Sequence, residues 1–465
     1  MDGATNRVLA TVSAGVSPAA LCYNPQNNKV SCANEYSDDM TVIDGATNGV
    51  VETVTLSSHP VALCYNTQDN RVYCANGTGS SVVVIDGATH QVLASVATGH
   101  YPGALCYNSQ DNKVYSANSR SRSVTVIDGA TNQVVTTVFA GDYPLALCYN
   151  PRSNKVYCAT AYNVVVIDGT TDSVLATVMA GSEPCALCYN PQNNKVYCAD
   201  YGSDNVMVID GVTNQTLAYV PTGSCPEYLC YNSQTNRVYC ANYYGCTATV
   251  IDGGSNGVVT TVDVGNGPYA VCYNPQNNSV YCANIDGDDV SVIDGLTNQV
   301  VATVPADSGP GVLYYNAQNN KIYCANRWSN NVTVIDGATN TVVSTVGVGP
   351  QPQALVWNPV QNRVYVANFY GSSISVLRDS GGGVEESFRP QVADSKPVAT
   401  IVHGVLFLPP ASGTKRGASN VLLNISGRRV LDLRPGVNDV RRLAPGVYFM
   451  KDGGRGKTQK VVVVQ

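Results

Sequence analysis

The chain has 465 residues, of which 44% are apolar and only 13% are charged, so it is long enough for several domains and too apolar to be disordered. It contains no run of roughly 18 apolar residues, which excludes a membrane-spanning helix. Residues 1–382 carry 14 Lys and Arg against 27 Asp and Glu, whereas residues 383–465 carry 13 against 6. Because an acidic first part repels phosphate, nucleic acid is not an expected partner.

A tandem repeat of 42 residues extends to residue 378. The segment Leu-Cys-Tyr-Asn and its variants place an aromatic residue once in each copy, at Tyr23, Tyr65, Tyr107, Tyr149, Tyr189, Tyr231, Tyr273, Tyr315 and Trp357. The spacing is 42 residues throughout, except for one of 40 between Tyr149 and Tyr189. Ile-Asp-Gly marks the same period from Asp44 to Asp336, and Arg378 stands where the next Asp would fall.

Each period contains four short apolar runs separated by turn residues. In the second copy the runs are Val61–Tyr65, Arg71–Ala75, Val82–Asp86 and Gln91–Val96. Val, Ile, Tyr and Thr dominate the runs, and Gly, Asn and Asp dominate the joints, which is typical of strands and hairpins. The Asp of Ile-Asp-Gly is expected to fix its turn by accepting hydrogen bonds from backbone amides. Four strands in about 40–45 residues predict one blade of a β-propeller.

The two ends of the array supply the parts of one blade. The chain opens with a fourth strand, Val8–Val12, and closes with first, second and third strands at Ala354–Asn358, Arg363–Ala367 and Ile374–Leu377. We therefore predict an all-β fold, a nine-bladed β-propeller of four-stranded blades over residues 1–378. Because the chain starts in the middle of a repeat, an open array and further upstream repeats remain alternatives.

The repeat resembles the YVTN-type propeller repeat of bacterial and archaeal surface and periplasmic proteins. The resemblance rests on Asn-Lys-Val-Tyr-Cys-Ala-Asp at 194–200, on Val-Thr-Val-Ile-Asp-Gly-Ala-Thr-Asn, and most fully on Tyr-Val-Ala-Asn at 365–368. It covers residues 2–378 and implies a propeller, but it implies no particular function, because propellers are scaffolds for many sites.

The remainder of the chain reads as a linker, residues 379–397, and a small C-terminal β-sandwich, residues 398–465. Leu-Asn-Ile-Ser-Gly-Arg at 423–428, Leu-Ala-Pro-Gly-Val-Tyr-Phe at 443–449 and Lys-Val-Val-Val-Val at 460–464 resemble the type A sorting domain of the type IX secretion system. This resemblance implies recognition by the secretion machinery and a secreted or outer-surface location. An accessory β-sandwich without that role would show the same strand pattern.

The chain has 17 cysteines. Six repeats place two of them ten residues apart, as in Cys22 and Cys32, which a symmetric hairpin would set directly opposite each other. Because the ninth repeat has Val356 and Val366 there, we predict small apolar core sites with free thiols. Cys225 and Cys246 are additional cysteines in loops of one blade, and we predict a disulfide between them.

The loops differ in how far they vary among the nine copies. Those after the first and third strands barely change, whereas those after the second and fourth strands change in every blade and open on the opposite face. Since all blades meet the same structural demands, the varied loops are the candidate binding surface, and their composition is typical of recognition surfaces. The candidate ligand-binding residues are Tyr36, His59, Tyr101, Tyr143, Tyr201, Tyr243, Tyr244, Tyr269, Trp328 and Tyr370.

We therefore expect a secreted or surface-displayed propeller that binds a macromolecule, glycan or protein. One alternative is a self-assembling surface-layer or adhesive component. Another is a propeller lyase or oxidoreductase, although no catalytic constellation is visible and no cofactor is expected. His59 and His100 lie on adjacent blades, but no third ligand accompanies them, so no metal site is predicted.

Overall fold

The computed structural model describes residues 6–379 and, nearer the C-terminus, residues 400–403, 405–408, 420–423, 428–433, 436–439, 446–451 and 458–464. The chain divides into two compact units, residues 1–385 and 386–465. In the part of the chain described, no helix has the length and apolar character that crossing a membrane would need.

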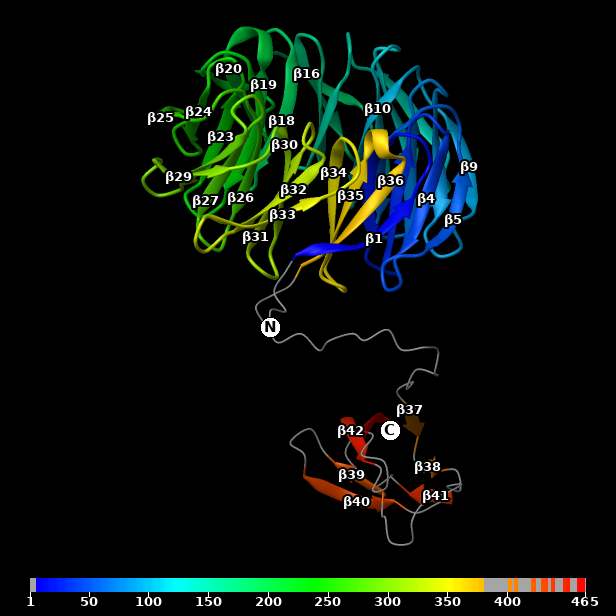
Figure 1. Cartoon of the computed structure of the whole chain (residues 1–465). Coiled ribbons are helices and arrows are strands. Elements are labelled where there is room, and N and C mark those ends of the chain that lie inside the picture. The colour runs from blue at the N-terminus through cyan, green and yellow to red at the C-terminus, as the bar shows by residue number, and fades with distance from the viewer. Residues whose placement is uncertain are drawn as a thin grey trace. The chain divides into compact units, whose positions relative to one another are not determined.

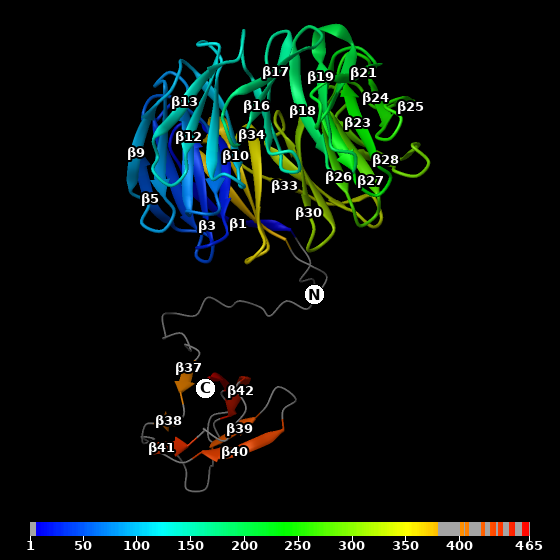
Figure 2. The ribbon, with the colours of Figure 1, turned by 180° about the vertical axis from the view of Figure 1, so that it is seen from behind.

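The first unit consists of nine four-stranded antiparallel sheets, which Figures 1 and 2 show standing in a ring. The first strands are innermost, because those of neighbouring blades contact each other. In blades 1 to 9 they are β2 (Pro18–Asn24), β6 (Pro60–Asn66), β10 (Pro102–Asn108), β14 (Ala146–Asn150), β18 (Pro184–Asn190), β22 (Pro226–Asn232), β26 (Pro268–Asn274), β30 (Pro310–Asn316) and β34 (Pro352–Asn358). The second strands are β3 (Lys29–Asn34), β7 (Arg71–Asn76), β11 (Lys113–Asn118), β15 (Lys155–Ala159), β19 (Lys195–Asp200), β23 (Arg237–Asn242), β27 (Ser279–Asn284), β31 (Lys321–Asn326) and β35 (Arg363–Asn368).

The third strands are β4 (Asp39–Asp44), β8 (Ser81–Asp86), β12 (Ser123–Asp128), β16 (Asn163–Asp168), β20 (Asn205–Asp210), β24 (Thr247–Asp252), β28 (Asp289–Asp294), β32 (Asn331–Asp336) and β36 (Ser373–Arg378). The fourth, outermost strands of blades 1 to 8 are β5 (Val50–Thr55), β9 (Val92–Ala97), β13 (Val134–Phe139), β17 (Val174–Met179), β21 (Thr216–Pro221), β25 (Val258–Asp263), β29 (Val300–Pro305) and β33 (Thr341–Gly347). Two single-turn 3₁₀ helices, η1 (Tyr201–Ser203) and η2 (Phe369–Gly371), follow second strands.

The core lies between the blades. The second and third strands are almost wholly buried, whereas the fourth strands are mostly exposed. This follows from the arrangement, because neighbouring blades cover both faces of each sheet and leave only its outer edge to solvent. A second-strand tyrosine fills each interface in blades 2 to 9, as Tyr73 and Tyr365 do, and both are fully buried.

The ring closes with one strand from each end of the array. Strand β1 (Arg7–Ser13) pairs antiparallel with β36, with Thr11 opposite Ser375 and Ser13 opposite Ser373. Figure 1 shows the blue β1 beside the yellow β36. The predicted nine-bladed, four-stranded propeller is therefore confirmed, and the array is closed. Nine blades exceed the usual four to eight.

A closed circle of asparagine side chains joins all nine blades. The Nδ2 of the last first-strand residue donates to the Oδ1 of a turn asparagine in the next blade, at 2.7–2.9 Å. The donor–acceptor pairs are Asn24–Asn70, Asn66–Asn112, Asn108–Asn154, Asn150–Asn194, Asn190–Asn236, Asn232–Asn278, Asn274–Asn320, Asn316–Asn362 and Asn358–Asn28. These contacts between blades explain why the turn after the first strand varies so little among the copies and always ends in asparagine. We call the side of the propeller that carries this circle the constant face.

Cations on the second strands reach from one blade to the next on the same face. Lys155 Nζ, for example, donates to the backbone oxygens of Gly211 and Val212 at 2.8 Å. At the closing blade Lys321 pairs instead with Asp379, at 2.6 Å, and both side chains are buried. Asp379 lies one residue beyond Arg378, where the repeat pattern ends, and it supplies the carboxylate that closes the ring.

The aspartates of Ile-Asp-Gly fix their turns as expected. Asp44 Oδ1 accepts hydrogen bonds from the backbone amides of Ala46 and Thr47, at 2.9 and 2.7 Å. A hydrogen bond from Lys29, together with those from Thr47, lowers the pKa of Asp44 to about 2 although burial opposes the shift.

The expected alignment of the paired cysteines was wrong by one residue. Cys22 lies opposite Ser31, and Leu21 lies opposite Cys32. The reason is that Asn24 pairs with Lys29 and leaves a four-residue turn, so the hairpin is not symmetric about the loop assumed. Since neighbouring strand residues face opposite sides, the two cysteines of a blade point away from each other. All 17 cysteines are free, and the second-strand ones are buried.

The C-terminal unit contains two sheets. The strands β37 (Thr400–His403), β43 (Thr458–Val464), β42 (Gly446–Lys451), β39 (Asn420–Leu423) and β40 (Arg429–Leu433) form a five-stranded sheet in that order, with β37 and β43 parallel. The strands β38 (Val405–Leu408) and β41 (Gly436–Asp439) form an antiparallel pair. A small β module is therefore present where the sequence predicts one.

Candidate functional site

The loops opposite the constant face hold strained backbone conformations, and we call that side the variable face. In eight blades the residue before the proline that begins the first strand has a positive φ. In blade 4 the strand begins later, and the residue before Pro144 has the positive φ. These residues are Ser17, His59, Tyr101, Tyr143, Glu183, Cys225, Gly267, Gly309 and Gln351. A left-handed conformation costs a non-glycine residue about 1–2 kcal/mol, and a following proline disfavours it further. Only two of the nine positions nevertheless use glycine.

Three predicted residues form one group across blades 9, 1 and 2. The ring centroid of Tyr36 lies 5.2 Å from that of His59 and 6.0 Å from that of Phe369, and Phe369 lies 5.2 Å from Tyr370. Glu35 Oε1 approaches His59 Nε2 at 3.8 Å. Tyr36 and Tyr370 stay exposed. The structure therefore brings Tyr36, His59 and Tyr370 together around Phe369.

Tyr101 forms a separate group on blades 2 and 3. The guanidinium of Arg120 lies 4.7 Å from the centroid of the Tyr101 ring, which is a cation–π contact. His100 Nδ1 lies 2.9 Å from Ser80 Oγ. These side chains line a hollow of about 370 Å³. His59 and His100 therefore have different partners and do not form a common site.

Tyr243, Tyr244 and Tyr269 form a third group, on blades 6 and 7. The ring centroid of Tyr243 lies 4.8 Å from that of Tyr244 and 6.4 Å from that of Tyr269. The hydroxyl of Tyr243 donates to Asp286 Oδ2 at 2.9 Å, and this hydrogen bond raises the pKa of Tyr243 to about 12. Arg327 lies 5.0 Å from the Tyr269 centroid.

Two further members of this third group, Glu227 and Tyr228, were not among the residues predicted from the sequence. The Tyr228 ring lies 5.3 Å from that of Tyr269. Burial raises the pKa of the Glu227 carboxyl, and Arg327 opposes that shift. Both residues lie on a first strand, outside the loops that were compared. The signal was present, because Tyr228 takes the place that Ala20, Ala62 and most other first strands give to alanine.

Trp328 lies beside the third group. Its side chain is 57% exposed, and its ring lies against Gly309, where a Cβ would come within 2.7 Å of the indole Cδ2. Gly309 has a positive φ and follows Ser308, whose carbonyl accepts from the Trp328 amide at 3.2 Å. The absence of a side chain at Gly309 therefore lets the exposed indole of Trp328 pack against the loop that contains Gly309.

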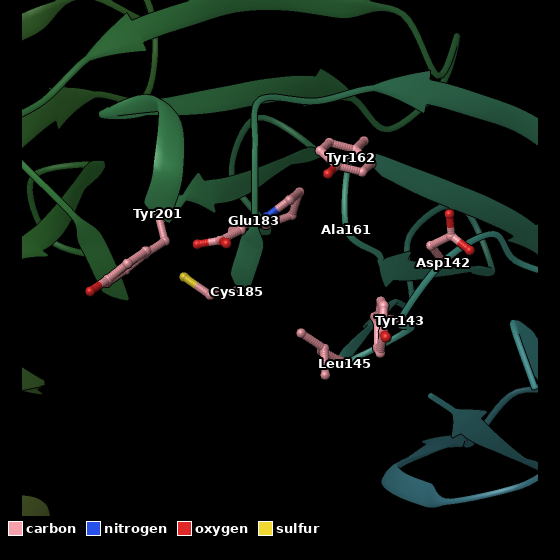
Figure 3. Close-up of a pocket in the computed structure, with 9 residues that line it drawn as sticks. Asp142, Tyr143, Leu145, Ala161, Tyr162, Glu183, Cys185 and Tyr201 are labelled. Atoms are coloured by element: carbon pink, nitrogen blue, oxygen red, sulfur yellow. The ribbon is translucent and has the colours of Figure 1, made fainter. Parts of the chain in front are cut away.

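A pocket of about 570 Å³ opens on this face between blades 4 and 5 (Figure 3). Tyr143 and Tyr201, both predicted, line it with Tyr162, Leu145 and Glu183. In Figure 3 these side chains surround an open centre, with Tyr201 on one side and Tyr143 and Leu145 on the other. Cys185 lies at the same wall, and burial raises the pKa of its thiol to about 12.

A shortened loop produces this pocket. In blade 2, six residues separate the paired residues Ala75 and Val82, whereas in blade 4 only four separate Ala159 and Val164. The single 40-residue spacing in the repeat therefore corresponds to a deletion between β15 and β16. The first strand β14 also begins late, at Ala146.

The profile described as YNCE-like beta-propeller matches residues 60–361, which is more than half of the chain. The chain belongs to this family. The match agrees with the resemblance to the YVTN-type repeat and covers the propeller alone. No curated protein matches the chain by sequence.

Solved structures share the fold of this YNCE-like propeller at low identity. Sqt1 of Saccharomyces cerevisiae matches with a TM-score of 0.59 and 10% identity, over 81% of this chain and all of that one. The dihydro-heme d1 dehydrogenase NirN matches with a TM-score of 0.56 and 13% identity, over 72% and 77%. AztD of Citrobacter koseri, in its apo form, matches with a TM-score of 0.50 and 14% identity, over 70% and 95%. At such identities these likenesses show the fold alone.

Cys225 and Cys246 of this YNCE-like propeller are free, so the predicted disulfide is not present in the structure. The two loops face different neighbours. Cys246 Sγ lies 3.2 Å from Asn266 Oδ1 towards blade 7, whereas the Cys225 amide donates to Asp204 of blade 5 at 2.8 Å.

Among the residues that the structure describes, no three His, Cys, Asp or Glu side chains are grouped closely enough to hold a metal ion. The variable face therefore offers aromatic rings, three arginines and separate carboxylates. Such groups bind by stacking, by cation–π contact and by hydrogen bonding.

Proposed function

We propose that this YNCE-like propeller binds a macromolecular ligand, glycan or protein, through its variable face. The observation that carries the proposal is the set of residues with positive φ before the first-strand prolines. Strain of this kind persists only where the surrounding structure maintains it, and it is concentrated at functional sites. Tyr101, Tyr143 and Glu183 hold such positions although glycine fits there, as Gly267 and Gly309 show.

The exposed side chains of the face support the same proposal. Tyr244, Tyr370 and Trp328 are each more than half exposed, and each belongs to or adjoins a group of rings. Tyrosine, tryptophan and arginine provide large contact area at a low cost in conformational entropy, and they are enriched where proteins recognise ligands. We propose binding without catalysis. The hydroxyl of Ser80 lies 2.9 Å from the imidazole of His100, but among the described residues no carboxylate contacts the other ring nitrogen of His100, as a catalytic triad would need.

We also propose that the protein is secreted or displayed on the outer surface. The support is the resemblance of residues 398–465 to a type A sorting domain, in a segment that folds as a small β module. In this proposal the C-terminal unit is the contact with the secretion machinery, and the propeller is the part that binds.

A glycan array probed with the full chain, with and without calcium, tests the binding proposal. We expect specific hits that weaken at least about tenfold, which is 1.4 kcal/mol, in Trp328→Ala and in Tyr243→Ala. The control is Leu296→Ala, which removes an exposed apolar side chain from the constant face. Hits that persist in both variable-face variants, or that disappear in the control, would contradict the proposal. A blank array would reject the glycan form and leave the protein form.

Self-assembly is a second candidate, favoured by the outer rim. The fourth strands repeat two exposed aliphatic residues near their starts, such as Val92 with Leu93 and Val134 with Val135. A belt of apolar edge strands can pair with another copy. Light scattering of the full chain separates the candidates, because growth of the scattering mass with concentration in the absence of ligand would support self-assembly.

A further inference from the structure

The pocket between blades 4 and 5 has one carboxylate without a partner. Glu183 has no ion pair or side-chain hydrogen bond within the described part of the chain. Asp142, the other acid at the pocket, forms an exposed ion pair with Arg122 at 2.5 Å, which offsets part of its charge. No Lys, Arg or His lines the pocket. Glu183 is therefore the lining acid whose charge no basic side chain offsets.

The backbone holds Glu183 rigidly at the wall of the pocket. Its φ is 57°, and the following residue is a proline. The Glu183 amide donates to the carbonyl of Ala161 at 2.9 Å, and its carbonyl accepts from the amide of Tyr201 at 3.0 Å. Ala161 lies in the shortened loop, so the deletion that opens the pocket also positions the acid. The Glu183 side chain consequently projects from a fixed point between Tyr162 and Tyr201 (Figure 3).

The remaining walls are aromatic and aliphatic. Tyr143, Tyr162 and Leu145 are each more than half exposed in the free protein, so their contact surface is available to a ligand. Three tyrosine rings around one unpaired carboxylate attract a cation that also has apolar surface, because ring faces and the carboxylate are negative while alkyl groups pack on the rings. An inorganic divalent cation fits poorly, since Ca²⁺ takes six to eight oxygen ligands.

We propose that this pocket binds an organic ammonium group, either a quaternary ammonium or the ε-ammonium of a lysine side chain. This proposal names a ligand class for one part of the variable face. It rests on the function proposed above, because the pocket belongs to that face. The cation would sit between the rings of Tyr143, Tyr162 and Tyr201 with its charge towards Glu183. Its alkyl groups would contact Leu145.

Calorimetric titration of the full chain tests the proposal with choline and with 3,3-dimethylbutan-1-ol, which has the same shape and no charge. We expect choline to bind at least about tenfold more tightly than the neutral alcohol. Glu183→Gln should remove that preference and leave the binding of the alcohol unchanged. Nα-acetyl-lysine methylamide and its Nε-trimethyl form serve as further probes. Tighter binding of choline than of either lysine derivative indicates a free quaternary amine as the source of the cation, and tighter binding of a lysine derivative indicates a protein side chain.

Two further variants separate the pocket from the rest of the face. Replacing residues 160–163 by residues 76–81 of blade 2 restores the longer loop and should abolish choline binding, whereas Glu35→Gln, which alters an acid elsewhere on the face, should not. Equal affinity for choline and the alcohol, or unchanged choline affinity in Glu183→Gln, would overturn the proposal, as would no binding at millimolar choline.

The outcome is independent of the macromolecular screen. Choline binding with a blank array and no protein ligand would keep this inference and reject the function proposed above. Array hits that survive Glu183→Gln in a chain that does not bind choline would do the reverse. Circular dichroism of each variant establishes that a lost signal does not reflect unfolding.

Discussion

Both faces of the propeller contain backbone positions with a positive φ, and the two faces use different residues at these positions. Each turn on the constant face needs a positive φ, and asparagine occupies all nine positions after the first strands, from Asn28 to Asn362. Asparagine tolerates this conformation, and here its amide also closes the circle between blades. The variable face needs the same conformation before its prolines but uses Tyr, Glu, His, Cys and Gln. One face is therefore selected for assembly, and the other retains side chains that assembly does not require.

The difference shows where a repeat protein carries its function. The nine copies meet the same structural demands, so each can be compared with the other eight. A strained or bulky residue that occurs in only one copy is therefore not explained by the fold. By this comparison the deletion in blade 4 and the tyrosine at 228 are features of single blades that the fold does not require, and both lie on the variable side.

The largest expected effect tests the constant face. Lys321→Met leaves the buried carboxylate of Asp379 without its partner, and removing one member of a buried pair costs about 3–5 kcal/mol. We expect a marked fall in the denaturant midpoint. The control is Lys29→Met, whose partner Asp44 is partly exposed, and it should cost about 1 kcal/mol or less. Equal losses in the two variants would show that closure of the ring does not depend on the buried pair.

A smaller effect sharpens the comparison at blade 5, where Asp200 replaces the asparagine found at the end of most second strands. Burial raises the pKa of Asp200 to about 6 from an ordinary value of 3.8. The folded state therefore loses stability as the pH rises through this range, because the charged form is disfavoured there. We expect Asp200→Asn to stabilise the protein on the order of 2 kcal/mol at pH 8 and to have no such effect at pH 3.

Asp44→Asn should change the stability in the opposite direction from Asp200→Asn. The pKa of Asp44 is lowered to about 2, so its contribution is present above pH 4 and is lost as the pH falls towards 2. Its replacement should destabilise the protein at pH 8. Urea unfolding at three pH values measures both variants, and a gain that is the same for Asp200→Asn at every pH would contradict the buried-charge explanation.

Most of the fold could be predicted from the sequence, because the period, the strand pattern and the split closing blade all repeat visibly. The cysteine alignment could not, since it depends on whether Asn24 ends the strand or begins the turn, and hydrogen bonding to the next blade decides that. The predicted aromatic residues lie in the loops of one face, except for Tyr269, which lies on the first strand β26. Their grouping depends on contacts between blades, as between Tyr36 and Phe369, which are over 300 residues apart. The 40-residue spacing was visible, but only the structure shows that it opens a pocket.

The most direct test of the account is the thermal melting of the full chain with Tyr143→Gly and Glu183→Gly combined. Both positions have positive φ, so glycine should relieve strain and raise stability by about 0.5–1 kcal/mol at each, while choline binding is lost. The matched control is Asn154→Gly in the same blade. Glycine also accepts the positive φ of this position, but the variant loses the hydrogen bonds to Asn108 and Asp111. It should therefore melt at a lower temperature than the parent. A double variant that melts at a higher temperature than the parent would support the division between the two faces. One that melts lower would show that these variable-face side chains stabilise the fold, and it would contradict the account.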